Sequence, residues 1–111
     1  MALVVWQTPA KRHLKALFDY YREHASDKVA CSLRDTIVTR VDQLENFPKS
    51  GTLDTELSTP ETQYYFLIAQ WGKRRYRIYY LYENDMCPIL AIWDCSMNPR
   101  KRRSQVISIK S

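Results

Sequence analysis

This 111-residue chain has little of the residue types that make a polypeptide flexible or cross-linked. It contains two glycines and five prolines, which leaves little room for a flexible linker. Its three cysteines, Cys31, Cys87 and Cys95, are an odd number without CxxC spacing, and no histidine cluster accompanies them. This pattern argues against a disulfide framework or a zinc site and predicts reduced thiols in the cytoplasm. We expect neither a metal ion nor another cofactor.

Long apolar segments are missing as well. The apolar N-terminus, residues 1–6, is too short for the hydrophobic region of a signal peptide and has no basic residues before it. No stretch is long enough for a transmembrane helix, so the sequence predicts no membrane association. The composition, 45% apolar and 26% charged, is globular. The length suits one domain, which we place at residues 1–99, followed by a basic tail over residues 100–111.

Charge is distributed unevenly along the chain. Residues 1–63 carry 8 Lys/Arg and 9 Asp/Glu, whereas residues 64–111 carry 9 Lys/Arg and 3 Asp/Glu, so the net charges are −1 and +6. A basic half raises the rate of encounter with an anionic partner. This pattern favours nucleic acid or an acidic protein as the partner. A surface that only keeps the protein in solution is the alternative.

The first half of the chain shows one strand pattern and two helix patterns. Residues 3–6 are β-prone, and the two stretches that follow have apolar residues every three or four positions. Thr8 and Ser26 suit the N-caps of the two helices. Pro48 disfavours helical geometry at the residue before it, so the second helix should end near Asn46. The short connection predicts an antiparallel helical hairpin that packs on a sheet.

The second half of the chain shows three strand patterns. They cover residues 64–71, 74–82 and 87–94, and the connections between them are short enough to imply consecutive antiparallel hairpins. The preceding residues 49–63 have the composition of a turn and an irregular surface loop. The predicted fold class is therefore α+β in the order β-α-α-β-β-β, with the helical hairpin on one face of a small antiparallel sheet.

The middle strand, residues 74–82, has two different faces. Strand alternation places Arg75, Arg77, Tyr79 and Leu81 on one face and Tyr76, Ile78, Tyr80 and Tyr82 on the other. The tyrosine-rich face is typical of a surface that packs on a core. The arginine-bearing face offers cations to a ligand or partner, and a solvated strand face is the alternative.

Two phrases in the sequence resemble the RelE/ParE toxin superfamily. One is Leu44-Glu45-Asn46-Phe47-Pro48-x-x-Gly51 at the end of the helical hairpin, and the other is Tyr76-Arg77-Ile78-x-Tyr80 in the middle strand. The resemblance covers residues 3 to about 99. It implies a growth-inhibiting toxin of a bacterial type II toxin–antitoxin system. A cognate acidic antitoxin would neutralise it, and the implied assembly is a dimer or a hetero-oligomer with that antitoxin.

The superfamily contains two kinds of toxin, which cleave messenger RNA in the ribosome (RelE-like) or poison DNA gyrase (ParE-like). Our leading interpretation is cleavage of messenger RNA. The RNA would be cleaved either in a ribosome-dependent reaction or as a free molecule. The resemblance then implies Arg77 in the phosphate site. Metal-independent RNA cleavage also needs an acid and a base, for which Tyr79 and Asp94 are the candidates. The alternatives without a chemical role are that Tyr79 is a residue at the edge of the core and that Asp94 caps a turn.

Further cations suit the binding of nucleic acid or antitoxin. They lie at the start of the middle strand and after the last strand and comprise Lys73, Arg75, Arg100, Lys101, Arg102 and Arg103. The last four form a block that would repel itself unless phosphates or an acidic chain neutralised it. The tail is therefore expected to be an extra strand, a frayed end or a segment ordered by a partner.

The sequence departs from RelE-like nucleases at several positions. The positions where those enzymes carry basic residues hold Phe66, Ile68 and Ser96 here. These differences are the main argument for the ParE-like alternative, a gyrase poison without catalytic residues. A third interpretation, from another class, is a non-catalytic RNA-binding or protein-interaction module.

Three other conspicuous residues have simpler explanations. His13 and His24 lie on the polar side of the first helix and are expected to be solvated. Trp71, beside the turn between two strands, is expected to be a core or hairpin residue. None of the three is predicted to take part in chemistry.

Overall fold

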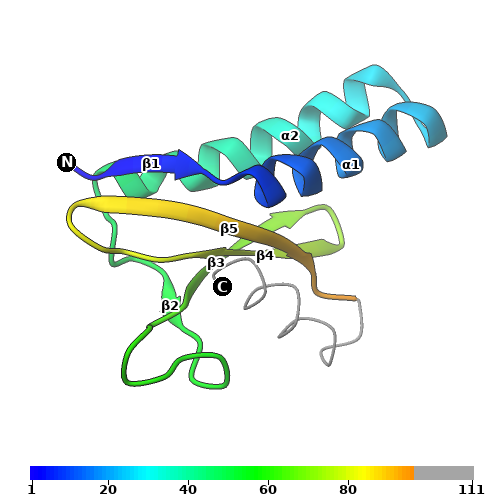
Figure 1. The fold of residues 1–111 in the computed structure, drawn as a ribbon. Coiled ribbons are helices and arrows are strands. Elements are labelled where there is room, and N and C mark those ends of the chain that lie inside the picture. Colours follow the sequence, from blue (N-terminus) through cyan, green and yellow to red (C-terminus); the bar gives the residue numbers. More distant parts are fainter. Residues whose placement is uncertain (97–111) are drawn as a thin grey trace.

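Within residues 1–96, which the computed structural model describes, two helices pack on one face of a five-stranded sheet (Figure 1). The elements in chain order are β1 (Leu3–Trp6), α1 (Thr8–His24), α2 (Asp27–Asp42), the 3-10 helix η1 (Gln43–Glu45), β2 (Thr52–Leu53), β3 (Tyr65–Trp71), β4 (Arg74–Tyr80) and β5 (Met86–Asp94). The predicted α+β class and the helical hairpin are confirmed. The short strand β2 was not predicted and lies in the segment expected to be an irregular loop.

The sheet is mixed, which corrects the expectation of an antiparallel sheet at one pair of strands. The strand order is β1-β5-β4-β3-β2, and β1 runs parallel to β5 with Leu3 opposite Met86 and Trp6 opposite Ile89. The remaining neighbours are antiparallel. Short hairpin connections dictate an antiparallel arrangement, but β1 and β5 lie at opposite ends of the domain sequence. Their relative direction is therefore set by how the whole chain folds.

The helix ends follow local sequence signals with one exception. Ser26 caps α2, because its hydroxyl accepts a backbone N–H at 3.1 Å, as predicted. η1 continues the turn beyond α2 as far as Glu45, in agreement with an end near Asn46. The exception is α1, where Gln7 is the N-cap and makes no side-chain capping bond, so Thr8 is already helical.

The main hydrophobic core lies between the helical hairpin and the sheet. Its buried side chains include Leu33, Ile37 and Val41 from α2 and Tyr76, Ile78 and Tyr80 from β4. Each Leu or Ile that is fully buried contributes about 1.5–3 kcal/mol to folding. The predicted scaffold face of β4 is confirmed. Trp71 also packs toward the helices, since its indole N–H lies 3.2 Å from the Ser32 hydroxyl.

The other face of the sheet carries a second apolar cluster. Tyr79, Leu81, Leu90, Ala91 and Trp93 are buried there together with Leu57 and Tyr64 from the segment between β2 and β3. A bulge brings Leu90 into this cluster, because Tyr79 pairs with Ala91 whereas Tyr80 pairs with Ile89. The face that was expected to meet a partner is thus a second core over much of its area.

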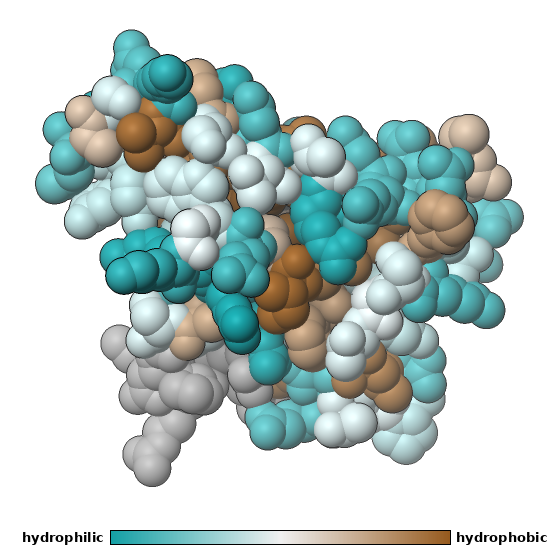
Figure 2. Space-filling view, turned by 180° about the vertical axis from the view of Figure 1, so that it is seen from behind, coloured by the Kyte–Doolittle hydropathy of each residue, from teal (hydrophilic) through white to brown (hydrophobic). Residues whose placement is uncertain are grey.

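The surface offers no large continuous apolar area on the side shown in Figure 2, where apolar residues form separate patches among hydrophilic ones. The exposed large apolar side chains in the described part include Met1, Leu3, Phe47 and Met86. Scattered residues of this kind are normal on a folded protein. Among residues 1–96, neither helix has the length and apolar character needed to cross a membrane.

Gly51 is predicted to resist substitution because it lies against the sheet. A Cβ added to Gly51 would lie 2.7 Å from Cε1 of Tyr80 and 2.9 Å from the carbonyl oxygen of Phe66. Since that carbonyl is part of the backbone, it cannot rotate away. Gly51→Ala should therefore lower the free energy of unfolding by about 1–3 kcal/mol in urea denaturation. Ser50→Ala, at the exposed neighbouring position, is the control, and equal stability of Gly51→Ala and the wild type would contradict the close contact.

Candidate functional site

The arginine-bearing face of β4 holds a polar cluster of four residues, Asp54, Phe66, Arg77 and Tyr79, which we call the Arg77 cluster. Arg77 and Tyr79 share this face because they are two residues apart on β4. Phe66 lies directly opposite Tyr79 on β3, and Asp54 follows β2. Three neighbouring strands therefore position the cluster.

The Arg77 guanidinium is held on three sides. Its Nη1 donates to the Tyr79 hydroxyl at 3.2 Å and lies 3.6 Å from Oδ2 of Asp54. Its Cζ lies 4.1 Å from the centroid of the Phe66 ring, which is cation–π geometry. The side chain remains 29% exposed, so one side of the guanidinium still meets solvent.

Asp54 is the acidic centre of the cluster and is only 4% exposed. Its Oδ1 accepts the backbone N–H groups of Glu56 and Leu57 at 3.0 and 3.1 Å. Its Oδ2 accepts the Tyr79 hydroxyl at 3.0 Å in addition to the ion pair with Arg77. A buried carboxylate requires such partners, since an unpaired buried charge is very costly. Asp54 thereby fastens the segment after β2 onto the sheet.

Tyr79 is fully buried, which changes what its hydroxyl can do. Burial raises the pKa of Tyr79 to about 12, and the Asp54 carboxylate acts in the same direction while Arg77 opposes it. The phenol therefore keeps its proton at neutral pH and donates a hydrogen bond to Asp54. A ring with no exposed surface is also unable to stack on a nucleic-acid base.

Asp94 lies on the opposite side of the sheet from the Arg77 cluster. It is in register with Tyr76, whose ring belongs to the main core, so strand alternation places it on the helix side. Its Oδ2 lies 3.3 Å from Nη1 of Arg74, and its Oδ1 accepts the backbone N–H and the hydroxyl of Ser96 at 2.9 and 2.8 Å. The structure therefore does not bring Asp94 together with Arg77. The side chain caps the turn after β5 instead.

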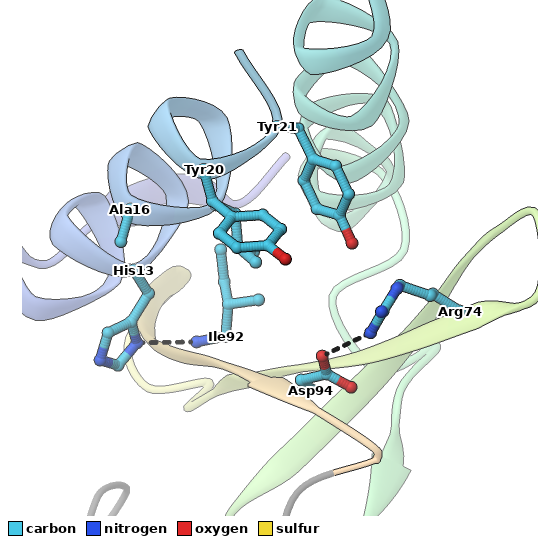
Figure 3. A pocket seen from close by; sticks show the side chains of 8 residues that line it. His13, Ala16, Tyr20, Tyr21, Arg74, Ile92 and Asp94 are labelled. Carbon is cyan, nitrogen blue, oxygen red and sulfur yellow. Dashed lines mark hydrogen bonds and ion pairs between the residues drawn. The ribbon is translucent and has the colours of Figure 1, made fainter. Parts of the chain in front are cut away.

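Asp94 instead lines a pocket between α1 and the ends of β4 and β5, which we call the α1–β5 pocket (Figure 3). The cavity has a volume of about 380 Å³ and is lined by His13, Ala16, Leu17, Tyr20, Tyr21, Arg74, Ile92 and Asp94. Figure 3 shows the Tyr21 ring directed from α1 toward Arg74. An apolar floor with a few polar groups at the rim is typical of small binding pockets.

His13 is not a solvated helix residue, in contrast to the sequence expectation. Its Nδ1 accepts the backbone N–H of Ile92 at 3.1 Å. β1 ends opposite Ile89, so the Ile92 N–H lies beyond that strand, and the imidazole takes the place of a strand partner. Burial lowers the pKa of His13, which favours the neutral ring that this bond requires. His24 is exposed on the last turn of α1, as expected.

The predicted binding cations fall into two groups. Lys73 and Arg75 are exposed at the hairpin between β3 and β4, where a surface hollow of about 450 Å³ is lined by Lys73, Arg74, Arg75, Asp94, Cys95 and Ser96. The basic block at 100–103 and the rest of the tail lie outside the described residues.

Asp54 is the residue that sequence reasoning missed. It lies in a stretch rich in Thr, Ser and acidic residues, in which many positions look alike. An available signal was the local pattern Asp54-Thr55-Glu56-Leu57, since an aspartate often accepts N–H groups two and three residues later in a turn. That signal predicts a turn, but not that the second carboxylate oxygen meets an arginine on β4.

The architecture is that of a small α+β domain with a helical hairpin over a mixed sheet. A chain in the solved structure of the chromosomal ParDE TA system from P. aeruginosa has the same fold, with a TM-score of 0.65 and 18% sequence identity. The match covers 85% of this chain and 96% of that chain. No match was found among curated proteins.

The sequence comparison assigns the protein to a class and then to a family. Residues 4–99 match the family described as the ParE toxin of the type II toxin-antitoxin system parDE. The class is thus the toxin component of a type II toxin–antitoxin system, and an antitoxin is the implied partner. This chain belongs to the ParE toxin family, and the resemblance to the RelE/ParE superfamily is confirmed.

Removal of the Tyr79 hydroxyl should destabilise the fold at neutral pH. Tyr79→Phe leaves Oδ2 of the buried Asp54 without its hydroxyl donor, and we expect a loss of about 1–3 kcal/mol in the free energy of unfolding. The folded-state pKa of about 12 exceeds the ordinary 10.0, so this contribution is present below pH 10.0 and is lost as pH rises toward about 12. Urea titrations of wild type and variant across that window should converge. Tyr65→Phe, with a hydroxyl bonded only at the surface, is the control.

Acid stability should depend on His13. Because burial lowers its pKa below the ordinary 6.5, the unfolded chain takes up a proton that the folded chain resists, and stability should fall as pH drops below 6.5. His13→Gln should remove this part of the loss of stability in acid. The measurement is the difference in urea midpoint between about pH 7.5 and pH 5.5. His24→Gln is the matched control and should behave as the wild type does. Identical pH dependence in His13→Gln and the wild type would contradict the role of the Ile92 bond.

Proposed function

We propose that this protein is the gyrase-directed toxin of a toxin–antitoxin pair and that it does not cleave messenger RNA. The observation that carries this proposal is the separation of the predicted catalytic residues. Asp94 lies on the helix side of the sheet, whereas Arg77 and the buried Tyr79 lie on the other side. Metal-independent cleavage needs an acid, a base and cations around one phosphate. Around Arg77 the described residues place Tyr79 and Asp54, which are both buried and bonded to each other, so neither is available to exchange a proton with an RNA substrate.

The surroundings of Arg77 support the same proposal. Phe66 and Ile68 occupy positions at which RelE-like nucleases carry basic residues. In this structure the Phe66 ring lies beneath the guanidinium, and Ile68 is paired with Arg77 across the two strands. An aromatic and an aliphatic side chain cannot neutralise the charge of a phosphorane-like transition state. Membership in the ParE family supports a gyrase target, because ParE-like members of the superfamily poison that enzyme.

In a cell whose growth is not inhibited, the proposed partner of the toxin is an acidic antitoxin. The two proteins would form a cytoplasmic hetero-oligomer. The C-terminal half of the sequence has a net charge of +6, and Lys73 and Arg75 present part of this charge at an exposed hairpin. An acidic chain would be attracted to this half over long range. The cations at 100–103 would add to the same attraction.

Two assays with the purified protein would separate the possible targets. We expect inhibition of supercoiling by DNA gyrase and intact messenger RNA in a translating-ribosome assay, because the toxin would act by binding. Asp94→Asn should keep its inhibitory activity, since Asp94 caps a turn and pairs with Arg74 away from Arg77. Messenger-RNA cleavage by the wild type, lost in Asp94→Asn and without any effect on supercoiling, would overturn the proposal. An unrelated small basic protein of similar net charge is the control for non-specific binding to DNA.

A further inference from the structure

A small cavity opens beside the Arg77 guanidinium on the sheet face away from the helices. It has a volume of about 220 Å³ and is lined by Thr52, Leu53, Asp54, Thr55, Glu56, Phe66 and Arg77. Because the Arg77 side chain is partly exposed, an ion in the cavity could reach the guanidinium directly. The cavity is thus placed where an oxyanion would meet an arginine.

The anion position next to Arg77 is already filled by this chain. Oδ2 of Asp54 accepts the Tyr79 hydroxyl at 3.0 Å and forms an ion pair with Nη1 of Arg77 at 3.6 Å. A hydroxyl donor and a guanidinium charge beside one oxygen form an arrangement that could also bind a phosphate oxygen. Asp54 is buried, whereas Arg77 retains contact with solvent, so the carboxylate is the inner of the two partners.

The carboxylate is held in this position by its own loop. The backbone N–H of Asp54 donates to the carbonyl of Tyr64 at 2.8 Å, and its carbonyl accepts the N–H of Ser58 at 3.0 Å. Oδ1 is bound by two further N–H groups of the same loop. Asp54 and the loop therefore move as one unit, and any movement of the loop away from β4 would take the anion with it.

We infer that Arg77 and Tyr79 form an oxyanion-binding pair whose resident anion is Asp54, and that Asp54 excludes phosphate from Arg77. A phosphate entering the cavity would meet the negative charge of Asp54, which also lines it. One side of Arg77 is exposed, but its charge is already neutralised by Asp54 in the folded toxin. This inference does not rest on the gyrase proposal, because it concerns the occupancy of Arg77 whatever the target is.

Phosphate binding to a matched set of variants tests the inference. Asp54→Asn removes the charge but keeps an Oδ1 that can accept the two loop N–H groups, so the loop should stay in place. Asp35→Asn removes the same charge from an exposed surface carboxylate and is the control. The probe is inorganic phosphate, added at constant ionic strength against chloride. The readout is the NMR signal of the Arg77 Nε–H group, assigned with Arg77→Lys.

We expect no saturable shift of the Arg77 signal in the wild type or in Asp35→Asn, and a saturable shift in Asp54→Asn with at least about tenfold tighter binding. A wild-type protein that binds phosphate at Arg77 as well as Asp54→Asn does would overturn the inference. A folded Asp54→Asn that gains no binding would overturn it too. If Asp54→Asn does not fold, Asp54→Ser is the second variant, because its hydroxyl can still accept a loop N–H.

The outcome is independent of the gyrase assay. If the wild type did not inhibit supercoiling, the expected result of the phosphate titration would be the same. Conversely, phosphate binding to wild-type Arg77 would leave the gyrase proposal standing. The two experiments therefore fail separately.

Discussion

The hydroxyl of Tyr80 joins the two parts of the chain on which the rest of the structure depends. It donates to the carbonyl of Pro48 at 3.0 Å and accepts the N–H of Gly51 at 2.9 Å. Pro48 and Gly51 follow the helical hairpin, and Tyr80 ends β4, so this hydroxyl ties the segment after the helices to the sheet. Burial raises the pKa of Tyr80 to about 12, which keeps the hydroxyl protonated and able to donate. The two sequence phrases that resemble the superfamily are thus in direct contact.

With its inner face anchored in this way, β4 places Arg77 and Tyr79 on the outer face. There the same principle is repeated, since a buried tyrosine hydroxyl again connects the strand to a loop, now through Asp54. Tyr79 and Tyr80 are adjacent in sequence but face opposite sides of the sheet and hold different loops. Arg77, which contacts both Tyr79 and Asp54, belongs to this structural network. Arg77 therefore contributes to the fold through its contacts with Phe66, Tyr79 and Asp54.

Local patterns predicted the parts of the fold that depend on neighbours in sequence. The apolar spacing of the helices, the Ser26 cap and the alternation in β4 all led to correct assignments, because periodicity decides which side chains share a face. The pairing of β1 with β5 was not predictable in this way. His13 was misjudged for a related reason, since its partner Ile92 comes 79 positions later in the chain. Contacts of that range leave no local signal.

The same distinction between local patterns and long-range contacts applies to the residues of the site. The sequence alone was sufficient to place Arg77 and Tyr79 on one strand face and to show that the C-terminal half is basic. Only the tertiary structure decided that Asp94 faces the helices and that Asp54 meets Arg77. The physical reason is that side-chain direction within an element follows from backbone geometry. Which distant carboxylate neutralises a cation depends instead on how the loops and strands pack.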